Sequence, residues 1–326
     1  MSQRYGMTVP FDNVPLSEHK EWYRELVDLG YTDIWSAEAN GADGFTPLAL
    51  AAAWAPELRL GSAIVPAFTR GPACLAQSVA SLADAAPGRV AFGIGSSSNV
   101  IIERWNGIPF EEPYRQVRDM VRFIRESLEG GKVSGEFAGR EIKGFRLGIK
   151  PAEQPAILIA ALRSGMLRLA GREGDGAIIN WLSAQDVRTV APIVAEAAAE
   201  AGRPAPEITA RIFVAPIADR DTVIAAGRFA IAAYLTVPVY NAFHEWLGRG
   251  EELAEMTRLW SEGDRSAALE AIPESLVDEL IVHGTPEECR EHIGSYVESG
   301  VTTPALAVLP FPGVDQRQAI RDLAPR

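Results

Sequence analysis

The chain has 326 residues, and with 47% hydrophobic residues it can bury a large core. Lys and Arg number 31 against 43 Asp and Glu, and the resulting net charge of −12 opposes binding to a nucleic-acid backbone. No apolar run approaches the roughly 18 residues of a membrane span, and the amino terminus lacks the apolar segment of a signal peptide. We therefore expect a cytoplasmic protein that binds neither nucleic acid nor a membrane.

Cysteine and histidine show no pattern typical of a disulfide framework or a metal site. The two cysteines, Cys74 and Cys289, both fall in helix-like segments, so we expect two small buried side chains. The four histidines lack the spacing of metal ligands, which predicts no metal site.

Eight apolar runs of the β type alternate with helical patterns along the chain. The strands are expected at residues 5–9, 33–37, 59–65, 89–95, 156–160, 176–180, 208–217 and 306–309. Amphipathic helices are expected between them, and two begin with a capping box, Ser183 with Asp186 and Thr285 with Glu288. Residues 132–150 read as a hairpin or irregular surface insertion, and broken helical segments at 222–282 follow the seventh strand.

This alternation predicts an α/β fold, a single (β/α)8 barrel over residues 1–326 with insertions after strands 4 and 7. A doubly wound open sheet is the competing fold, but no G-x-G-x-x-G motif follows the first strand. In a parallel barrel the functional site lies in the loops at the carboxyl ends of the strands.

The loop after the third strand is rich in groups that contact ligands. Phe68, Thr69 and Arg70 bring a ring, a hydroxyl and a permanent cation to the carboxyl end of that strand. An ordinary connection between a strand and a helix is the alternative interpretation.

The loops after the fourth and fifth strands could hold a ligand. Residues 96–99, Ser-Ser-Ser-Asn, are small donors and acceptors that follow a glycine-containing strand. After the fifth strand, the N–H groups of residues 163–166 would point outward at a helix start, as in phosphate sites of barrels. A plain N-cap by Ser164 is the alternative, although Arg163 and Arg168 favour an anion.

Five ordered blocks of the sequence resemble the luciferase-like flavin and deazaflavin oxidoreductases, and within them the branch that uses coenzyme F420. The blocks are residues 60–72, 88–98, 159–171, 174–176, and 284–288 with 299–301. The likeness runs from about Tyr5 to Pro310. It implies a barrel, a bound flavin-like ring and hydride transfer.

The resemblance also implies where the cofactor binds. It places an unusual cis non-proline bond at Ala63–Ile64, a bulge behind the deazaflavin ring, and a phosphate-holding turn at Arg163 to Met166. The cofactor-binding residues that follow from it are Ser62, Ala63, Ile64, Ser96, Ser97, Ala160, Ala161, Arg163, Ser164, Gly165, Met166 and Asn180.

The chain departs from many relatives after the second strand, where they carry a histidine or a pair of acids. Here the sequence is Ser36-Ala37-Glu38-Ala39, so Glu38 is the obvious proton-transfer group and the candidate catalytic residue. Hydride reduction of an enone or imine needs a proton at the adjacent atom, which a partly buried carboxylic acid can supply. A solvated turn carboxylate is the alternative role for Glu38.

The leading hypothesis is an F420-dependent oxidoreductase that moves a hydride between the deazaflavin and a small organic substrate. An FMN-dependent monooxygenase of the same fold is the second hypothesis, and a barrel that binds a flavin or other ligand without turnover is the third. The expected partner is the small-molecule substrate, and a homodimer is left open. Aromatic residues in 236–271, including Tyr240 and Trp246, suggest a lid over the site, with core packing as the alternative.

Overall fold

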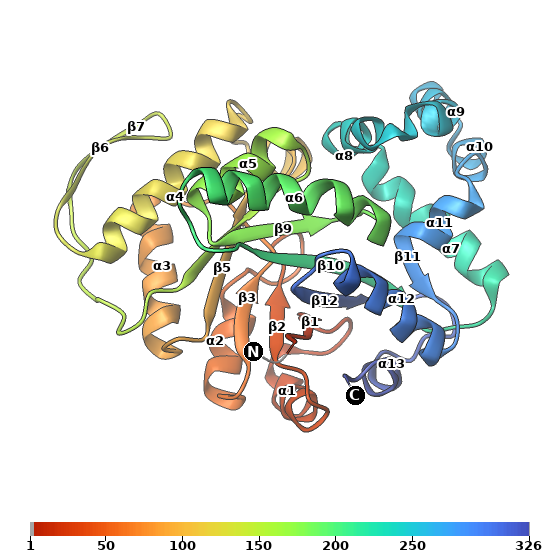
Figure 1. The fold of residues 1–326 in the computed structure, drawn as a ribbon, viewed down its shortest axis with the longest axis horizontal. Helices are drawn as coiled ribbons and strands as arrows, with labels where there is room; N and C mark the ends of the chain where they lie inside the picture. Colours follow the sequence, from red (N-terminus) through yellow and green to blue (C-terminus); the bar gives the residue numbers. More distant parts are fainter. Residues whose placement is uncertain (1–2, 326) are drawn as a thin grey trace.

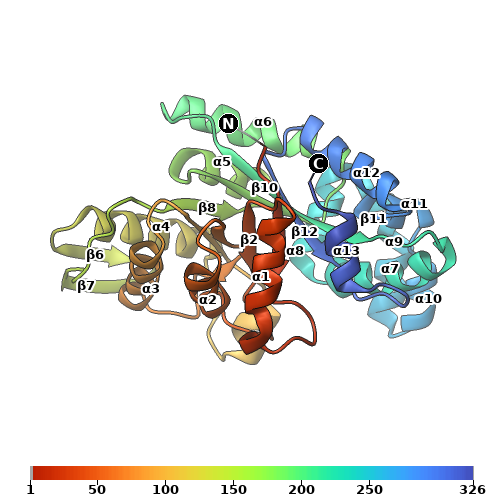
Figure 2. The ribbon, with the colours of Figure 1, turned by 90° about the horizontal axis from the view of Figure 1, so that it is seen from below.

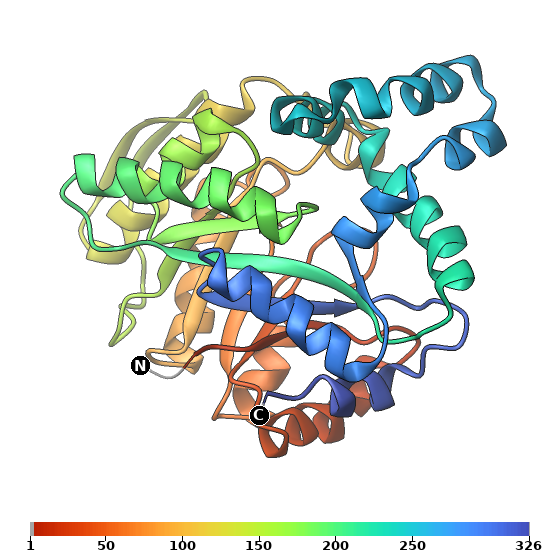
Figure 3. The same cartoon turned by 45° about the vertical axis from the view of Figure 1, so that its right-hand side comes forward.

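The computed structural model describes residues 3–325 and shows a closed barrel of eight parallel strands, in Figure 1 and, turned by 45°, in Figure 3. Each strand pairs in parallel with the next one around the barrel, and the last strand pairs with the first. The predicted (β/α)8 fold is therefore confirmed. The barrel strands are β1 (Gly6–Val9), β2 (Asp33–Ser36), β3 (Arg59–Ser62), β5 (Val90–Gly95), β8 (Ala156–Ala160), β9 (Gly176–Asn180), β10 (Glu207–Ala215) and β12 (Thr303–Val308).

Helices surround the barrel because each buries an apolar face against the strands. Figure 2 shows three of them, α1, α2 and α3, side by side along the barrel. The surrounding helices are α1 (His19–Asp28), α2 (Thr46–Trp54), α3 (Pro72–Ala85), α4 (Pro113–Glu129), α5 (Ser164–Glu173), α6 (Ala184–Glu200), α12 (Pro286–Glu298) and α13 (Gln316–Asp322). Both predicted capping boxes, at the starts of α6 and α12, are present.

Two insertions interrupt the repeating pattern, as predicted. After α4 an antiparallel hairpin of β6 (Val133–Phe137) and β7 (Arg140–Phe145) projects from the body, at the left of Figure 1. The second insertion follows β10 and occupies the right-hand side of that view. It consists of α7 (Arg220–Leu235), α8 (Pro238–His244), the π-helical η3 (Glu245–Arg249), α9 (Gly250–Glu262), α10 (Arg265–Glu270), α11 (Glu274–Leu280) and β11 (Ile281–His283).

Several local boundaries differ from the expectations. The third strand breaks after Ser62, and a separate short strand, β4 (Val65–Pro66), pairs with β5. The end of the expected helical region is strand β11, because it pairs with the carboxyl half of β10. Strand β12 begins at Thr303, before the expected start, and a π-helical segment, η2 (Val100–Trp105), follows β5. Cys289 is buried as expected, but Cys74 is exposed on α3, so the expectation for Cys74 was wrong.

Within residues 3–325 no single helix has the length and apolarity to cross a membrane. The pair Arg220–Leu235 and Pro238–Glu262 has that length and apolarity only when its two helices are taken together, and they are bent by 107°.

The middle of the barrel is filled by one large side chain, that of Trp35, which is fully buried. It packs in an interior cluster with Leu158 and Ile178 from the opposite side of the barrel. Glycines on the two neighbouring strands make room for the indole. A Cβ atom at Gly6 would lie 2.7 Å from Trp35, and one at Gly61 would lie 2.2 Å from it. No side chain fits there without displacing the tryptophan.

The amino-terminal end of the barrel is closed by a buried ion-pair network. Arg59 donates two hydrogen bonds to Glu207, at 2.7 and 2.8 Å, and one to Asp33 at 3.4 Å. Burial by itself raises the pKa of Glu207, but the hydrogen bonds and charge of Arg59 outweigh it and hold this pKa below its ordinary value. Thr303 and Thr209 donate further bonds to the same carboxylate. The barrel is therefore closed at this end and in its middle.

We predict that Gly61→Ala destabilises the fold by about 1–3 kcal/mol, because the added methyl group overlaps the Trp35 ring. Gly294→Ala is the control, since a Cβ atom at that helical position meets nothing within 4 Å and alanine is the better helix former. Urea unfolding of both variants measures the difference. Equal stability of the two variants would show that Trp35 is free to move aside.

Candidate active site

The carboxyl ends of the barrel strands gather the residues that the sequence singled out. Glu38 follows β2, Ala63 follows β3, Ser96 follows β5, Arg163 follows β8, and Asn180 is the last residue of β9. All these strands are parallel, so the residues share one rim of the barrel, as predicted. Their roles in binding and catalysis stay predictions.

Solvent reaches the barrel from this rim. The inward-facing residues at its carboxyl end, including Ala63, Ala160 and Asn180, keep intermediate exposure, whereas Leu158 and Ile178 below them are buried. The residues at the rim are small as well. A Cβ atom at Gly95 would lie 2.8 Å from that of Ala160, so the strands approach each other closely here. This arrangement leaves room for a planar group above the Trp35 layer.

The peptide bond between Ala63 and Ile64 is cis, at the position that the resemblance implies. Backbone hydrogen bonds hold this bulge against the end of β2, from Ala63 to Ser36 and from Glu38 to Ile64. The bulge therefore lies at the rim, beside the end of β2.

Two of the predicted cofactor-binding residues lie in the wall itself. The hydroxyl of buried Ser62 donates to the carbonyl of Gly93 at 3.0 Å and accepts from its N–H at 2.9 Å. Buried Ala161 donates its N–H to Ile178. These residues shape the wall, while Ser96, Ser97 and Ala160 are among the partly exposed members of the set.

The start of α5 is an uncapped helix terminus. The helix begins at Ser164 itself, so the N-cap position falls on Arg163, whose side chain makes no capping hydrogen bond. Arg163, Ser164 and Gly165 are exposed, and a Cβ atom at Gly165 would meet nothing within 4 Å. The plain N-cap by Ser164, the alternative drawn from the sequence, is therefore wrong. No side chain caps the first turn, and its first residues are exposed, which suits an anion.

Glu38 is held in an ion pair that the sequence did not indicate. Arg70 donates two hydrogen bonds to its carboxylate, at 2.6 and 2.8 Å, and the N–H of Gly44 donates a third at 2.8 Å. The hydrogen bond to Glu38 is the main cause that raises the pKa of Arg70. Both residues line a cavity of about 380 Å³ with Thr69, Ile101 and Asn106 among its walls. Arg70 and the N–H of Gly44 thus fix the position of the Glu38 carboxylate at this cavity.

A polar cluster on β9, β10 and α8 joins Asn180 and Tyr240, which the sequence singled out, to Arg211, which was missed. The amide of Asn180 donates to the hydroxyl of Tyr240 at 3.3 Å, and burial raises the pKa of Tyr240 to about 12. Arg211 is the strand partner of Asn180 in β10. The only signal for Arg211 in the sequence was a cation in the middle of an apolar strand.

Aromatic side chains of the barrel wall and of the second insertion pack together beside this cluster. Trp181, which follows β9, stacks on Phe213 of β10 at 4.0 Å between ring centroids, and Tyr234 of α7 lies 4.6 Å from Trp181. Tyr240 meets Tyr234 edge to face at 5.3 Å. His244 is buried, and burial lowers its pKa to about 4, so it is neutral near pH 7. These contacts are core packing, and a lid formed by the aromatic residues of the insertion stays a prediction.

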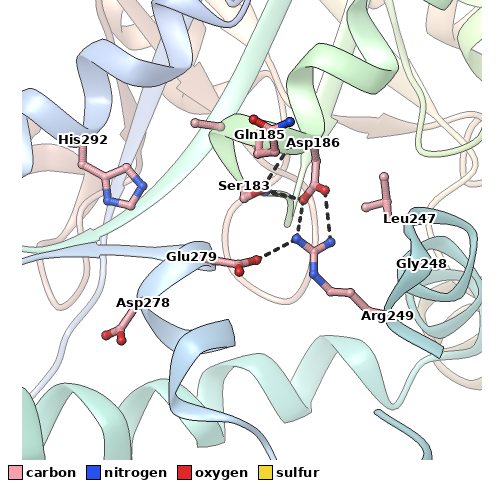
Figure 4. Close-up of a pocket in the computed structure, with 10 residues that line it drawn as sticks. Ser183, Gln185, Asp186, Leu247, Gly248, Arg249, Asp278, Glu279 and His292 are labelled. Carbon is pink, nitrogen blue, oxygen red and sulfur yellow. Dashed lines mark hydrogen bonds and ion pairs between the residues drawn. The ribbon is translucent and has the colours of Figure 1, made fainter. Parts of the chain in front are cut away.

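A second cavity, of about 540 Å³, lies beside the barrel between α6, η3 and α11 (Figure 4). Its centre is Arg249, which donates to Asp186 at 3.2 and 2.9 Å and to Glu279 at 2.8 Å. Its central charged groups are already paired with each other, so we interpret this cavity as a clamp. The clamp fastens the second insertion to the start of α6.

We predict that Arg249→Met lowers the free energy of unfolding by roughly 3–5 kcal/mol, because it leaves the nearly buried carboxylate of Asp186 without its cation. Arg258→Met is the control, since its pairs with Glu255 and Glu262 are exposed and its loss should be hard to measure. Chemical denaturation compares the two. Similar losses in both variants would contradict the clamp.

Comparison with known proteins identifies the family. The model of the luciferase-like monooxygenase family matches residues 3–303, so the chain belongs to this family. The chain is 27% identical over 310 residues to a 5,10-methylenetetrahydromethanopterin reductase of Archaeoglobus fulgidus, covering 92% of each chain. It is 29% identical to an F420-dependent glucose-6-phosphate dehydrogenase of Rhodococcus erythropolis, covering 100% of this chain and 91% of the relative.

Solved structures confirm the fold. The F420-dependent tetrahydromethanopterin reductase of Methanopyrus kandleri superposes with a TM-score of 0.82 at 21% identity, over 99% of this chain and 98% of that chain. An F420-dependent secondary alcohol dehydrogenase gives a TM-score of 0.81 at 18% identity with the same coverage. The EDTA monooxygenase of Chelativorans sp. BNC1 gives 0.74 at 14% identity, over 99% and 92%. The predicted family is thus confirmed, and the F420-dependent relatives agree with the predicted branch.

Proposed function

We propose that this protein is an F420-dependent oxidoreductase that moves a hydride between the deazaflavin and a small organic substrate. The observation that carries the proposal is the uncapped start of α5 on the same rim as the small, closely spaced residues Gly95 and Ala160. A ring with a phosphate-bearing tail needs both room at the rim and an anion site. F420-dependent relatives at 27% and 29% identity support the same assignment.

The residues present fit such a cofactor. The first-turn N–H groups of α5, with Arg163 and Arg168 near them, would hold its phosphate, and the bulge would support its ring. Ser96, Ser97 and Asn180 would border it with small polar groups. When bound, the cofactor supplies the hydride chemistry.

The chain's own residues have three tasks in this proposal. The packed rings of Trp181, Phe213 and Tyr234 keep water from one side of the rim. The Trp35 layer fixes the floor. Glu38, held in position by Arg70, moves the proton that accompanies the hydride.

Side-by-side equilibrium binding of F420 and FMN to the purified apoprotein tests the proposal. We expect F420 to bind and FMN to bind at least ten times more weakly. The reverse order would support the FMN-dependent monooxygenase, whose fold the EDTA monooxygenase shares. If neither cofactor binds, the remaining hypothesis is a barrel that binds another ligand.

We predict that Gly165→Pro weakens F420 binding by about 1–3 kcal/mol, because it removes one N–H donor from the first turn of α5. Proline is tolerated in a first helical turn, so the variant should fold. Gly165→Ala is the matched control, since it keeps the N–H and its Cβ atom has open space. Titration of both variants with F420 measures the difference in affinity. Unchanged affinity of the proline variant would show that the start of α5 does not bind the cofactor.

We predict that Glu38→Gln keeps cofactor binding while turnover falls about 10²- to 10⁴-fold, the usual contribution of a positioned proton-transfer group. Stopped-flow reoxidation of the reduced cofactor by activated alkenes and imines measures this turnover. Arg70→Met is the control, because it breaks the same ion pair but keeps the carboxyl group. Equal losses in the two variants would make the ion pair structural. Full turnover of Glu38→Gln would move the proton transfer to another group.

A further inference from the structure

Arg211 lies inside the barrel near its open end. Side chains of a strand alternate between its two faces, so Glu207, Thr209 and Arg211 share one face of β10. Glu207 and Thr209 belong to the network that closes the barrel, which identifies this face as the interior. Phe213 shares the face too, and the guanidinium carbon of Arg211 lies 4.9 Å from the centre of its ring.

Apart from the ring of Phe213, Arg211 has no partner for its charge. Within residues 3–325 its side chain forms no hydrogen bond and no ion pair, and its Nε is buried without an acceptor. The carboxylate nearest along the strand, Glu207, is already bound by Arg59. The side chain as a whole is partly exposed, so its guanidinium is within reach of a ligand, and a ligand would also satisfy the buried Nε.

Other unsatisfied polar atoms surround the same space. The Oδ1 atom of Asn180 and the Oγ1 atom of Thr8 are both buried without a partner. Asn180 pairs with Arg211 across β9 and β10, and its amide donates to the hydroxyl of Tyr240. That hydroxyl therefore has its own proton available for an acceptor. Arg211 and Tyr240 together offer donors and one positive charge, and no negative charge.

The position relative to the bulge indicates which ligand this is. Strand β10 stands opposite β3 in the closed barrel, four strands away in either direction. A ring supported by Ala63–Ile64 would turn its free face towards Arg211. The substrate, and not the phosphate tail, would occupy that face.

We propose that Arg211, assisted by Tyr240 and positioned beside Asn180, binds a carboxylate of the substrate, so that the substrate is an organic acid anion. The proposal rests on the proposed function for the orientation of the ring. One guanidinium matches one carboxylate through two parallel hydrogen bonds, and the single cation suits a monoanion better than a phosphate. With a net charge of −12 the protein repels anions at long range, so a local cation is required to select one.

Calorimetric titration of cinnamate and cinnamamide into the F420-loaded protein tests the proposal, because the two probes differ in charge but hardly in shape. We expect cinnamate to bind at least tenfold more tightly than cinnamamide. Arg211→Met should weaken cinnamate at least tenfold, leave cinnamamide unchanged and leave F420 affinity within twofold. Arg258→Met is the matched control and should change none of these values.

Three results would overturn the proposal. The first is that the wild type binds both probes with equal affinity. The second is that Arg211→Met binds cinnamate as tightly as the wild type does. The third is a tenfold loss of F420 affinity in that variant, which would make Arg211 the counter-ion of the cofactor. If the methionine variant does not fold, Arg211→Lys replaces it and should bind cinnamate with intermediate affinity. Wild-type cinnamate affinity in the lysine variant would then contradict a two-bond contact.

A separate readout distinguishes this proposal from the proposed function. Phenylglyoxal should modify Arg211 in the apoprotein, and cinnamate but not cinnamamide should protect it, as mass spectrometry of the peptide would show. Failure of the wild type to bind F420 would refute the cofactor assignment alone. Absence of protection would refute the carboxylate site, whether or not F420 binds.

Discussion

The packing of Trp35 in the middle of the barrel is the constraint on which the rest of the structure depends. An indole of this size fits only because Gly6 and Gly61 on the adjacent strands lack side chains. With the Arg59–Glu207 network beneath it, the tryptophan closes the barrel in its lower half. Any site in the interior must therefore lie above Trp35, where the strands end and the loops begin.

The arginines Arg59 and Arg211 of the barrel interior differ in a way that separates structure from function. Arg59 at the closed end is bound to carboxylates, and the hydroxyls of Thr209 and Thr303 complete the acceptor capacity of Glu207. Arg211 at the open end has none of these contacts. The same strand, β10, carries Glu207 of the first site and Arg211 of the second. A fully satisfied network stabilises the barrel, whereas the partly exposed, unpaired cation at the open end of the same strand is free to bind a ligand.

Local patterns in the sequence predicted the elements, and long-range pairing decided the details. Apolar runs located all eight barrel strands, and the capping boxes at Ser183 and Thr285 lie where they were expected, because both signals are contained within a few residues. Strand β11 was taken for helix because its pairing with β10 involves residues far apart in the chain. Glu38 and Arg70 were each singled out, but their ion pair was not foreseen, because it too joins residues far apart in the chain. The cis bond at Ala63–Ile64 was expected only from the family resemblance.

The pairing of Glu38 changes how the rim divides its chemical work. Arg70 and Glu38 compensate each other's charge, so their side of the rim offers no unpaired cation to an anionic substrate. Arg211, reached through β10, would attract an anion to the other side. A substrate with one carboxylate would therefore be oriented by this difference, with its acidic end at Arg211 and its reacting end nearer Glu38. Specificity of this kind needs no tight pocket, because Arg211 is unpaired and Arg70 is not.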